Sequence, residues 1–152
     1  MLPQENVRDI TQQVWDMTFP YALSFSEEDL TSLDTGNTHT GCVKIGEPFN
    51  AVIAVRCTAG LGERIAKIFF GSDSEISAEN IVDTLAELAN MIGGNIKAAL
   101  SGGDEPAKLS TPAVIEHEDY ISCFPPSWIT VRVPFKCADD YVEVLVLLAS
   151  EQ

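Results

Sequence analysis

The 152-residue chain has a formal net charge of −14, and 45% of its residues are hydrophobic. This length predicts a single domain over residues 1–152, and the hydrophobic fraction is enough for an ordinary core. Its nine Lys and Arg residues are scattered, which argues against a nucleic-acid or membrane partner, because both need clustered positive charge. The first residues lack the apolar core of a signal peptide and no apolar run could cross a bilayer, so we expect a cytoplasmic protein.

The first half of the chain predicts a helix, two strands and a second helix. Residues 5–17 carry apolar side chains at helical spacing, and Phe19-Pro20 ends that helix. Residues 27–37 are polar and predict a loop. Residues 41–46 and 50–58 predict strands joined by a turn at Glu47-Pro48. Residues 61–70 predict a short helix whose inward side chains are Leu61, Ile65, Ile68 and Phe69.

A long amphipathic helix is predicted over residues 76–100. Ser77 can cap it with Asn80 at the third helical position, and Ile76 with Ile81 can form a hydrophobic staple. Its apolar side holds Ile81, Leu85, Leu88, Ile92, Ile96 and Ala99. Its polar side holds Asp83, Glu87, Asn90, Gly94 and Lys97, which we call the polar stripe.

The remainder of the chain predicts strands near 108–116, 128–136 and 141–149. In the last of these, valines at alternate positions predict one largely apolar face and one mixed face. The order of helices and strands predicts an α+β fold, with a layer of helices on a mostly antiparallel sheet.

The polar stripe is open to two interpretations. A surface helix always has a solvated face, and charged and amide side chains are typical of it. However, Asn is a poor helix former, and Gly93 and Gly94 each cost about 1 kcal/mol relative to Ala inside a helix. The glycines therefore predict a close approach to the helix backbone, and the stripe predicts a binding or catalytic site.

The stripe also resembles the signature of the CheC/CheX/FliY phosphatases, which dephosphorylate the response regulator CheY. That signature has Asp or Ser, Glu, Asn and Pro at fixed spacing, here Asp83, Glu87, Asn90 and Pro112, with the last gap one residue short. Gly94 matches as well. The single intact copy of the motif makes CheX the most similar member. The resemblance implies a CheC/CheX-like fold with pseudo-symmetric halves, and homodimerisation.

The resemblance implies a phosphatase that acts on a phospho-aspartyl receiver domain in chemotaxis or related two-component signalling. Glu87 is then expected to pair with the receiver's lysine and Asn90 to place the attacking water. We expect Asp83, Gly94 and Lys97 to contact the receiver and Pro112 to shape a sheet edge. The chain needs no cofactor or metal of its own, because the receiver supplies Mg²⁺.

A weak internal repeat relates the two long helices. An offset of 74 residues places Asp83 on Asp9 and Met91 on Met17, and the pair Glu87 and Asn90 falls on Gln13 and Asp16. Gln13 and Asp16 are therefore predicted to be a degenerate second site, because a carboxylate in place of the amide repels a phosphoryl group.

The four cysteines, Cys42, Cys57, Cys123 and Cys137, lack metal-binding spacing, and we expect buried, reduced thiols. Two other functions remain open. The first is a binding module that docks on or sequesters a receiver without hydrolysis. The second, favoured less, is a carboxylate hydrolase that uses Glu87 with Asp83, for which no other segment supplies an opposing acid.

Overall fold

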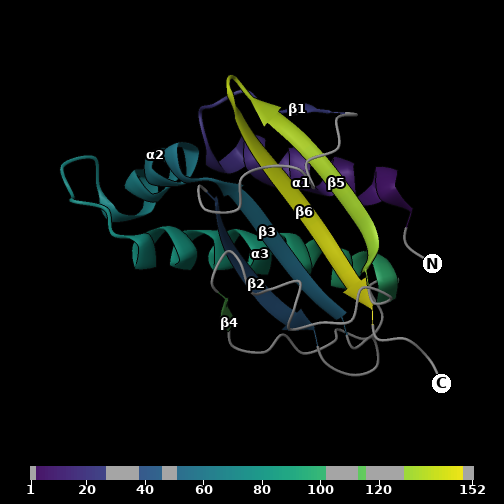
Figure 1. Ribbon diagram of the computed structural model, residues 1–152. Helices are drawn as coiled ribbons and strands as arrows, with labels where there is room; N and C mark the ends of the chain where they lie inside the picture. Colours follow the sequence, from purple (N-terminus) through teal and green to yellow (C-terminus); the bar gives the residue numbers. More distant parts are fainter. Residues whose placement is uncertain (1–2, 27–37, 46–50, 102–112, 116–128, 149–152) are drawn as a thin grey trace.

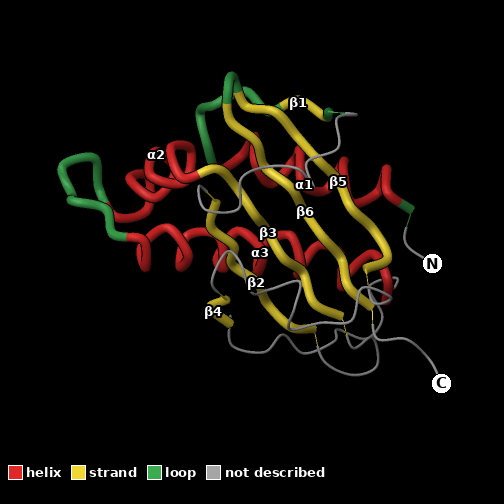
Figure 2. The backbone as a smooth tube through the Cα atoms, viewed as in Figure 1, coloured by secondary structure: helices red, strands yellow, loops and turns green. Residues whose placement is uncertain are grey.

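The structure, a computed structural model, describes residues 3–26, 38–45, 51–101, 113–115 and 129–148. Its elements in chain order are α1 (Gln4–Thr18), β1 (Ser24–Phe25), β2 (Thr38–Ile45), β3 (Ala51–Thr58), α2 (Ala59–Phe70), α3 (Ala78–Ser101), β4 (Ala113–Ile115), β5 (Ile129–Cys137) and β6 (Asp140–Leu148). All strand pairs are antiparallel, and the described helices lie on one face of the sheet (Figure 1 and Figure 2). The predicted α+β layer is confirmed.

The predicted elements agree with the structure to within a few residues at most ends. The two-residue strand β1 was not predicted, because so short a segment carries no periodic signal. The described strand β4 covers three residues of the segment 108–116. The predicted loop at 27–37 and the turn at Glu47-Pro48 lie outside the described residues.

The main core lies between the sheet and the helices. Alternate strand residues face it, and they meet buried side chains of all three helices, such as Trp15, Leu61 and Leu88. Three predictions of inward side chains were wrong. Ile68 and Phe69 are 45% and 40% exposed because the last turns of α2 carry them away from the buried positions that begin at Leu61. Ala99, near the end of α3, is also exposed.

The opposite face of the sheet is buried over part of its area. The β6 residues Leu145 and Leu147 form a second apolar cluster there, so the face predicted to be mixed is more apolar than expected. On the same face the Glu143 carboxylate accepts hydrogen bonds from Arg56 and Arg132, each at 3.1 Å. Because one carboxylate binds two guanidinium groups, this cluster holds β3, β5 and β6 together.

The sheet has a pseudo-twofold order that confirms the predicted halves. The strand order is β1-β5-β6-β3-β2-β4. If β1 is exchanged with β4, β2 with β5 and β3 with β6, the same order is obtained, read from the other edge of the sheet. Helix α1 precedes the first set of strands and α3 precedes the second. They begin at Gln4 and Ala78, which is the offset of 74 residues that the sequence repeat predicts.

Gly41 belongs to a row of paired residues that crosses the sheet. Val133, Val144, Val55 and Gly41 lie side by side on β5, β6, β3 and β2. A Cβ atom on Gly41 would lie 2.3 Å from the backbone nitrogen of Ala86 and 2.7 Å from the carbonyl oxygen of Val82. Helix α3 therefore packs with its backbone directly on β2, which only glycine allows at this position.

Cys42, Cys57 and Cys137 are buried thiols, as predicted, whereas Cys123 lies outside the described residues. Burial raises the pKa of the Cys57 thiol to about 12, and the nearby Asp140 contributes to the increase. Burial also raises the pKa of Cys137. Both thiols are therefore protonated at neutral pH and serve as core side chains.

We expect Gly41→Ala to destabilise the protein. The added methyl group meets main-chain atoms of α3 that cannot rotate away, and overpacking of this kind costs about 1–3 kcal/mol. Urea unfolding followed by circular dichroism measures the loss. Gly60→Ala in α2 is the matched control: its nearest contact would be 3.7 Å from Asp140 Oδ1, so it should be neutral or slightly stabilising. Equal stability of wild type and Gly41→Ala would contradict the close packing of α3 on β2.

Candidate functional site

The start of α3 is fixed by reciprocal hydrogen bonds. The backbone N–H of Asn80 donates to Ser77 Oγ at 3.1 Å, and the backbone N–H of Ser77 donates to Asn80 Oδ1 at 3.0 Å. This is a capping box with the shorter Asn side chain in the position usually taken by Glu or Gln. The predicted cap is confirmed, and it sets the rotation of the helix from its first turn.

The polar stripe lies on the side of α3 that faces away from the core. Asp83 and Glu87 are exposed, and Asn90, Gly94 and Lys97 are partly buried. The opposite side holds the buried residues Ile81, Leu85, Leu88, Ile92 and Ile96. Glu87 and Asn90 are three residues apart, so their side chains leave the same face of the helix about one turn apart.

The polar groups of the stripe have no partners within the described part of the chain. Neither the Glu87 carboxylate nor the Asn90 amide forms a hydrogen bond there, and neither Asp83 nor Glu87 forms an ion pair. Two carboxylates four residues apart on a helix repel by roughly 0.2–0.5 kcal/mol. The stripe is therefore suited to a cationic group from another molecule, which would relieve this repulsion.

The two adjacent glycines of α3 have different surroundings. A Cβ on Gly93 would lie 3.4 Å from Ile53 Cγ1 and 3.5 Å from Val43 Cγ1, so strand side chains approach the helix there, as predicted. A Cβ on Gly94 would meet no atom within 4 Å. The described part of the chain therefore gives no packing reason for glycine at Gly94, which lies in the middle of the polar stripe.

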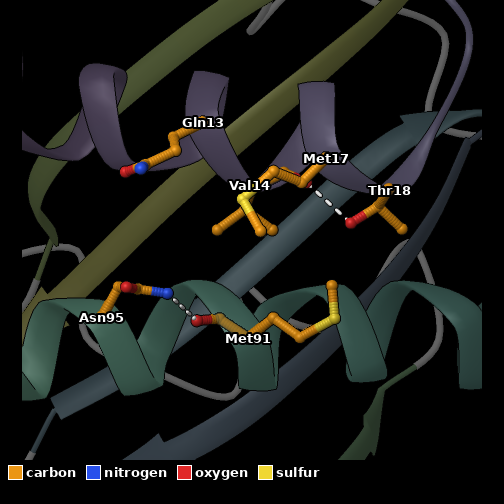
Figure 3. A pocket seen from close by; sticks show the side chains of 6 residues that line it. All are labelled: Gln13, Val14, Met17, Thr18, Met91 and Asn95. Atoms are coloured by element: carbon orange, nitrogen blue, oxygen red, sulfur yellow. Dashed lines mark hydrogen bonds between the residues drawn. The ribbon is translucent and has the colours of Figure 1, made fainter.

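The predicted second site lies on α1, outside the polar stripe. Gln13 and Asp16 are both exposed on α1, and Asp16 accepts a hydrogen bond from the Gln12 side chain at 3.1 Å. Gln13 lines a groove between α1 and α3 (Figure 3). Pro112 lies outside the described residues.

Two features of this region were not predicted from the sequence. The first is Gly41, which lets α3 pack on β2 at the turn that carries Asp83 and Glu87. A glycine within a strand-like run is a signal of close backbone approach, so the sequence did contain a clue. The second is the groove between α1 and α3, which depends on tertiary packing.

The chemistry available to the pair Glu87 and Asn90 is that of one carboxylate and one primary amide. The carboxylate accepts hydrogen bonds and attracts a cation, and the amide can donate and accept at the same time. Among the described residues no cluster of three His, Cys, Asp or Glu side chains could hold a metal ion. None of the described helices combines the length and the apolar character needed to cross a bilayer.

Comparison with known proteins identifies the family. The family model for the chemotaxis phosphatase CheX matches residues 39–135. No curated protein sequence matches the chain. Among solved structures, the CheX-CheY-BeF3-Mg²⁺ complex from Borrelia burgdorferi contains a chain with 21% identity and a TM-score of 0.73, covering 96% of this chain and 97% of that one.

Other solved structures show the same fold. CheX from Vibrio vulnificus has 16% identity and a TM-score of 0.66, covering 93% of this chain and 94% of that one. FliY from Thermotoga maritima has 15% identity and a TM-score of 0.54, covering 98% of this chain and 92% of that one. The family model spans most of the sheet and the polar stripe of α3, so the chain belongs to the CheX family of chemotaxis phosphatases.

Proposed function

We propose that this protein dephosphorylates a phospho-aspartyl receiver domain of the CheY type, with Glu87 and Asn90 entering the receiver's phosphorylation pocket. The observation that carries the proposal is the pair itself: a carboxylate and an amide one turn apart on the outer side of α3, without partners in the described chain. Membership of the CheX family supports it, as does the similarity to the Borrelia burgdorferi structure, which is a complex of CheX with CheY.

In the proposed reaction, the main task of this chain is to position a water molecule. The substrate is an acyl phosphate whose oxygens are held by the receiver's own Mg²⁺ and lysine, so in-line placement of water is the main task that remains. The side-chain oxygen of Asn90 accepts a hydrogen bond from the water, and the side-chain N–H group donates one to a phosphoryl oxygen. The water oxygen bonds to phosphorus as the bond to the aspartyl oxygen breaks, which releases phosphate and a free carboxylate.

Glu87 has a different role, which is to dock the receiver. Its carboxylate pairs with the receiver's lysine, and Asp83 adds negative charge one turn earlier on the same stripe. An exposed ion pair contributes about 0–1 kcal/mol, but docking removes this pair from water and makes its loss more costly. Lys97 lies further along the stripe and contacts the receiver at its edge. The family resemblance also implies a homodimer, in which the stripe of each copy would have to stay exposed for a receiver to dock.

The alternative is a module that binds a receiver without hydrolysis. The unpartnered carboxylates fit this function equally well, because they explain docking. Hydrolysis requires in addition a group that orients water, and the Asn90 amide can supply it. Release of phosphate from a phosphorylated receiver, measured with and without this protein, separates them.

We expect Asn90→Ala to lower the rate of phosphate release about 100-fold, because the water is no longer positioned. Binding to a beryllofluoride-activated receiver should be retained within about twofold, since the amide is small and its contacts are few. Asn90→Asp has the same shape but repels the phosphoryl group, so it should lose both rate and affinity. A full rate in either variant would contradict the role of Asn90.

Glu87→Gln should weaken receiver binding more than Asn90→Ala does, by roughly tenfold or more, because the receiver's lysine loses its partner. Isothermal titration with the activated receiver measures this affinity. Glu79→Gln is the matched control, since Glu79 is exposed on the same helix, two turns before Glu87 and outside the polar stripe. Equal affinities for wild type and Glu87→Gln would show that Glu87 does not dock the receiver.

Gly94→Ala should make the protein more stable but weaken its binding to the receiver. The methyl group enters open space and removes a helix-interior glycine, so the free energy of unfolding should rise by about 0.5–1 kcal/mol. Affinity for the receiver should fall, because the receiver packs against the helix backbone at this position. A variant that gains stability and also keeps full affinity would show that the receiver does not approach Gly94.

A further inference from the structure

A groove of about 360 Å³ lies between α1 and α3 on the helix side of the molecule. Figure 3 shows its two walls facing one another, with four residues from α1 and two from α3. The residues that line it are Gln13, Val14, Met17, Thr18, Met91 and Asn95.

The groove is continuous with the polar stripe. Met91 follows Glu87 by four residues and Asn95 follows Met91 by four, so these three side chains form one row along α3. Asn90 and Gly94 lie on the other side of Glu87. Glu87 therefore stands between the amide that is proposed to act on the phosphoryl group and the groove that opens toward α1.

The lining has the chemistry of a site for a protein loop. No residue of the groove is charged, and Val14, Met17 and Met91 supply apolar surface. The Gln13 amide forms no hydrogen bond within the described chain. The Asn95 amide donates to the Met91 carbonyl oxygen at 2.9 Å, which leaves its own oxygen as an acceptor. Free amide groups on both walls can bind backbone N–H and C=O groups, while the apolar floor accepts a side chain.

Met17 is the most exposed large apolar side chain of the groove. It is 80% exposed, at a position where a surface helix normally carries a polar residue. Methionine is flexible and polarisable, and it is common on surfaces that adapt to a partner. The sequence repeat pairs Met17 with Met91, and the structure places these two side chains on opposite walls of the groove.

A receiver interface of ordinary size would extend beyond the polar stripe. Specific protein interfaces bury about 800 Å² on each partner, which involves roughly 20 residues a side. The polar stripe of α3 offers five residues, all on one helix, so a docked receiver has to cover neighbouring surface as well. The groove begins at the next residue in the row after Glu87, and α1 forms its far wall.

We propose that this groove is the second half of the receiver docking surface, where Met17 and Met91 enclose an apolar side chain from a loop beside the receiver's phosphorylation pocket. This inference rests on the function proposed above. Gln13 is then a docking residue in its own right, which holds the loop's backbone, and the degenerate copy of the motif on α1 has kept a binding role without chemistry.

The test compares Met17→Gln with wild type. The change keeps the length of the side chain and removes its apolar end, and the high exposure of Met17 means that folding is not affected. Affinity for the beryllofluoride-activated receiver should fall about tenfold. In phosphate release, KM should rise by the same factor while kcat stays unchanged, because the water-positioning amide is intact.

Ile68→Gln is the matched control, because Ile68 is an exposed apolar residue of α2 outside the groove. The affinity of this variant for the receiver should equal that of wild type. Unchanged KM and affinity in Met17→Gln, with wild-type activity present, would overturn the groove proposal and leave the proposed function intact. A shift in oligomeric state without a change in receiver affinity would assign the groove to a second copy of the chain and overturn it as well. Failure of wild type to bind or dephosphorylate any receiver would instead reject the function on which the proposal rests.

Discussion

The contact between Gly41 and the backbone of α3 is the constraint on which the candidate site depends. It brings the helix turn between Val82 and Ala86 directly onto strand β2, so the inner side of α3 is buried from Ile81 to Ile96 and the rotation of the helix is fixed. In the row of paired residues that contains Gly41, the residue on β5 is Val133, which has a branched side chain. The two halves share one topology, and glycine on one side allows the close packing of α3.

A rigid helix suits the chemistry proposed for this family member. Positioning a water molecule requires a side chain whose base does not move, and α3 is fixed by a capping box at its start and by the sheet along its length. The polar groups that this arrangement presents to solvent cost a little helix stability through repulsion between Asp83 and Glu87. A cationic group of the proposed receiver would relieve that cost, which would link the local chemistry of the stripe to recognition of the partner.

Features that depend on local residue patterns could be predicted from the sequence, whereas features that depend on packing between distant elements could not. The cap at Ser77, the buried side of α3 and the offset of the two halves follow from spacing and residue type, and the structure agrees with them. Ile68 and Phe69 have helical spacing but are exposed, because periodicity does not show how far a helix extends past its core. The role of Gly41 and the groove beside Met17 depend on distances between elements far apart in the chain.

The most direct test of the account is the structure of this protein in complex with a beryllofluoride-activated receiver domain. The account predicts that the Asn90 amide lies within hydrogen-bond distance of the phosphoryl mimic and that the Glu87 carboxylate contacts the receiver's lysine. A receiver bound with α3 and its polar stripe left in solvent would contradict it.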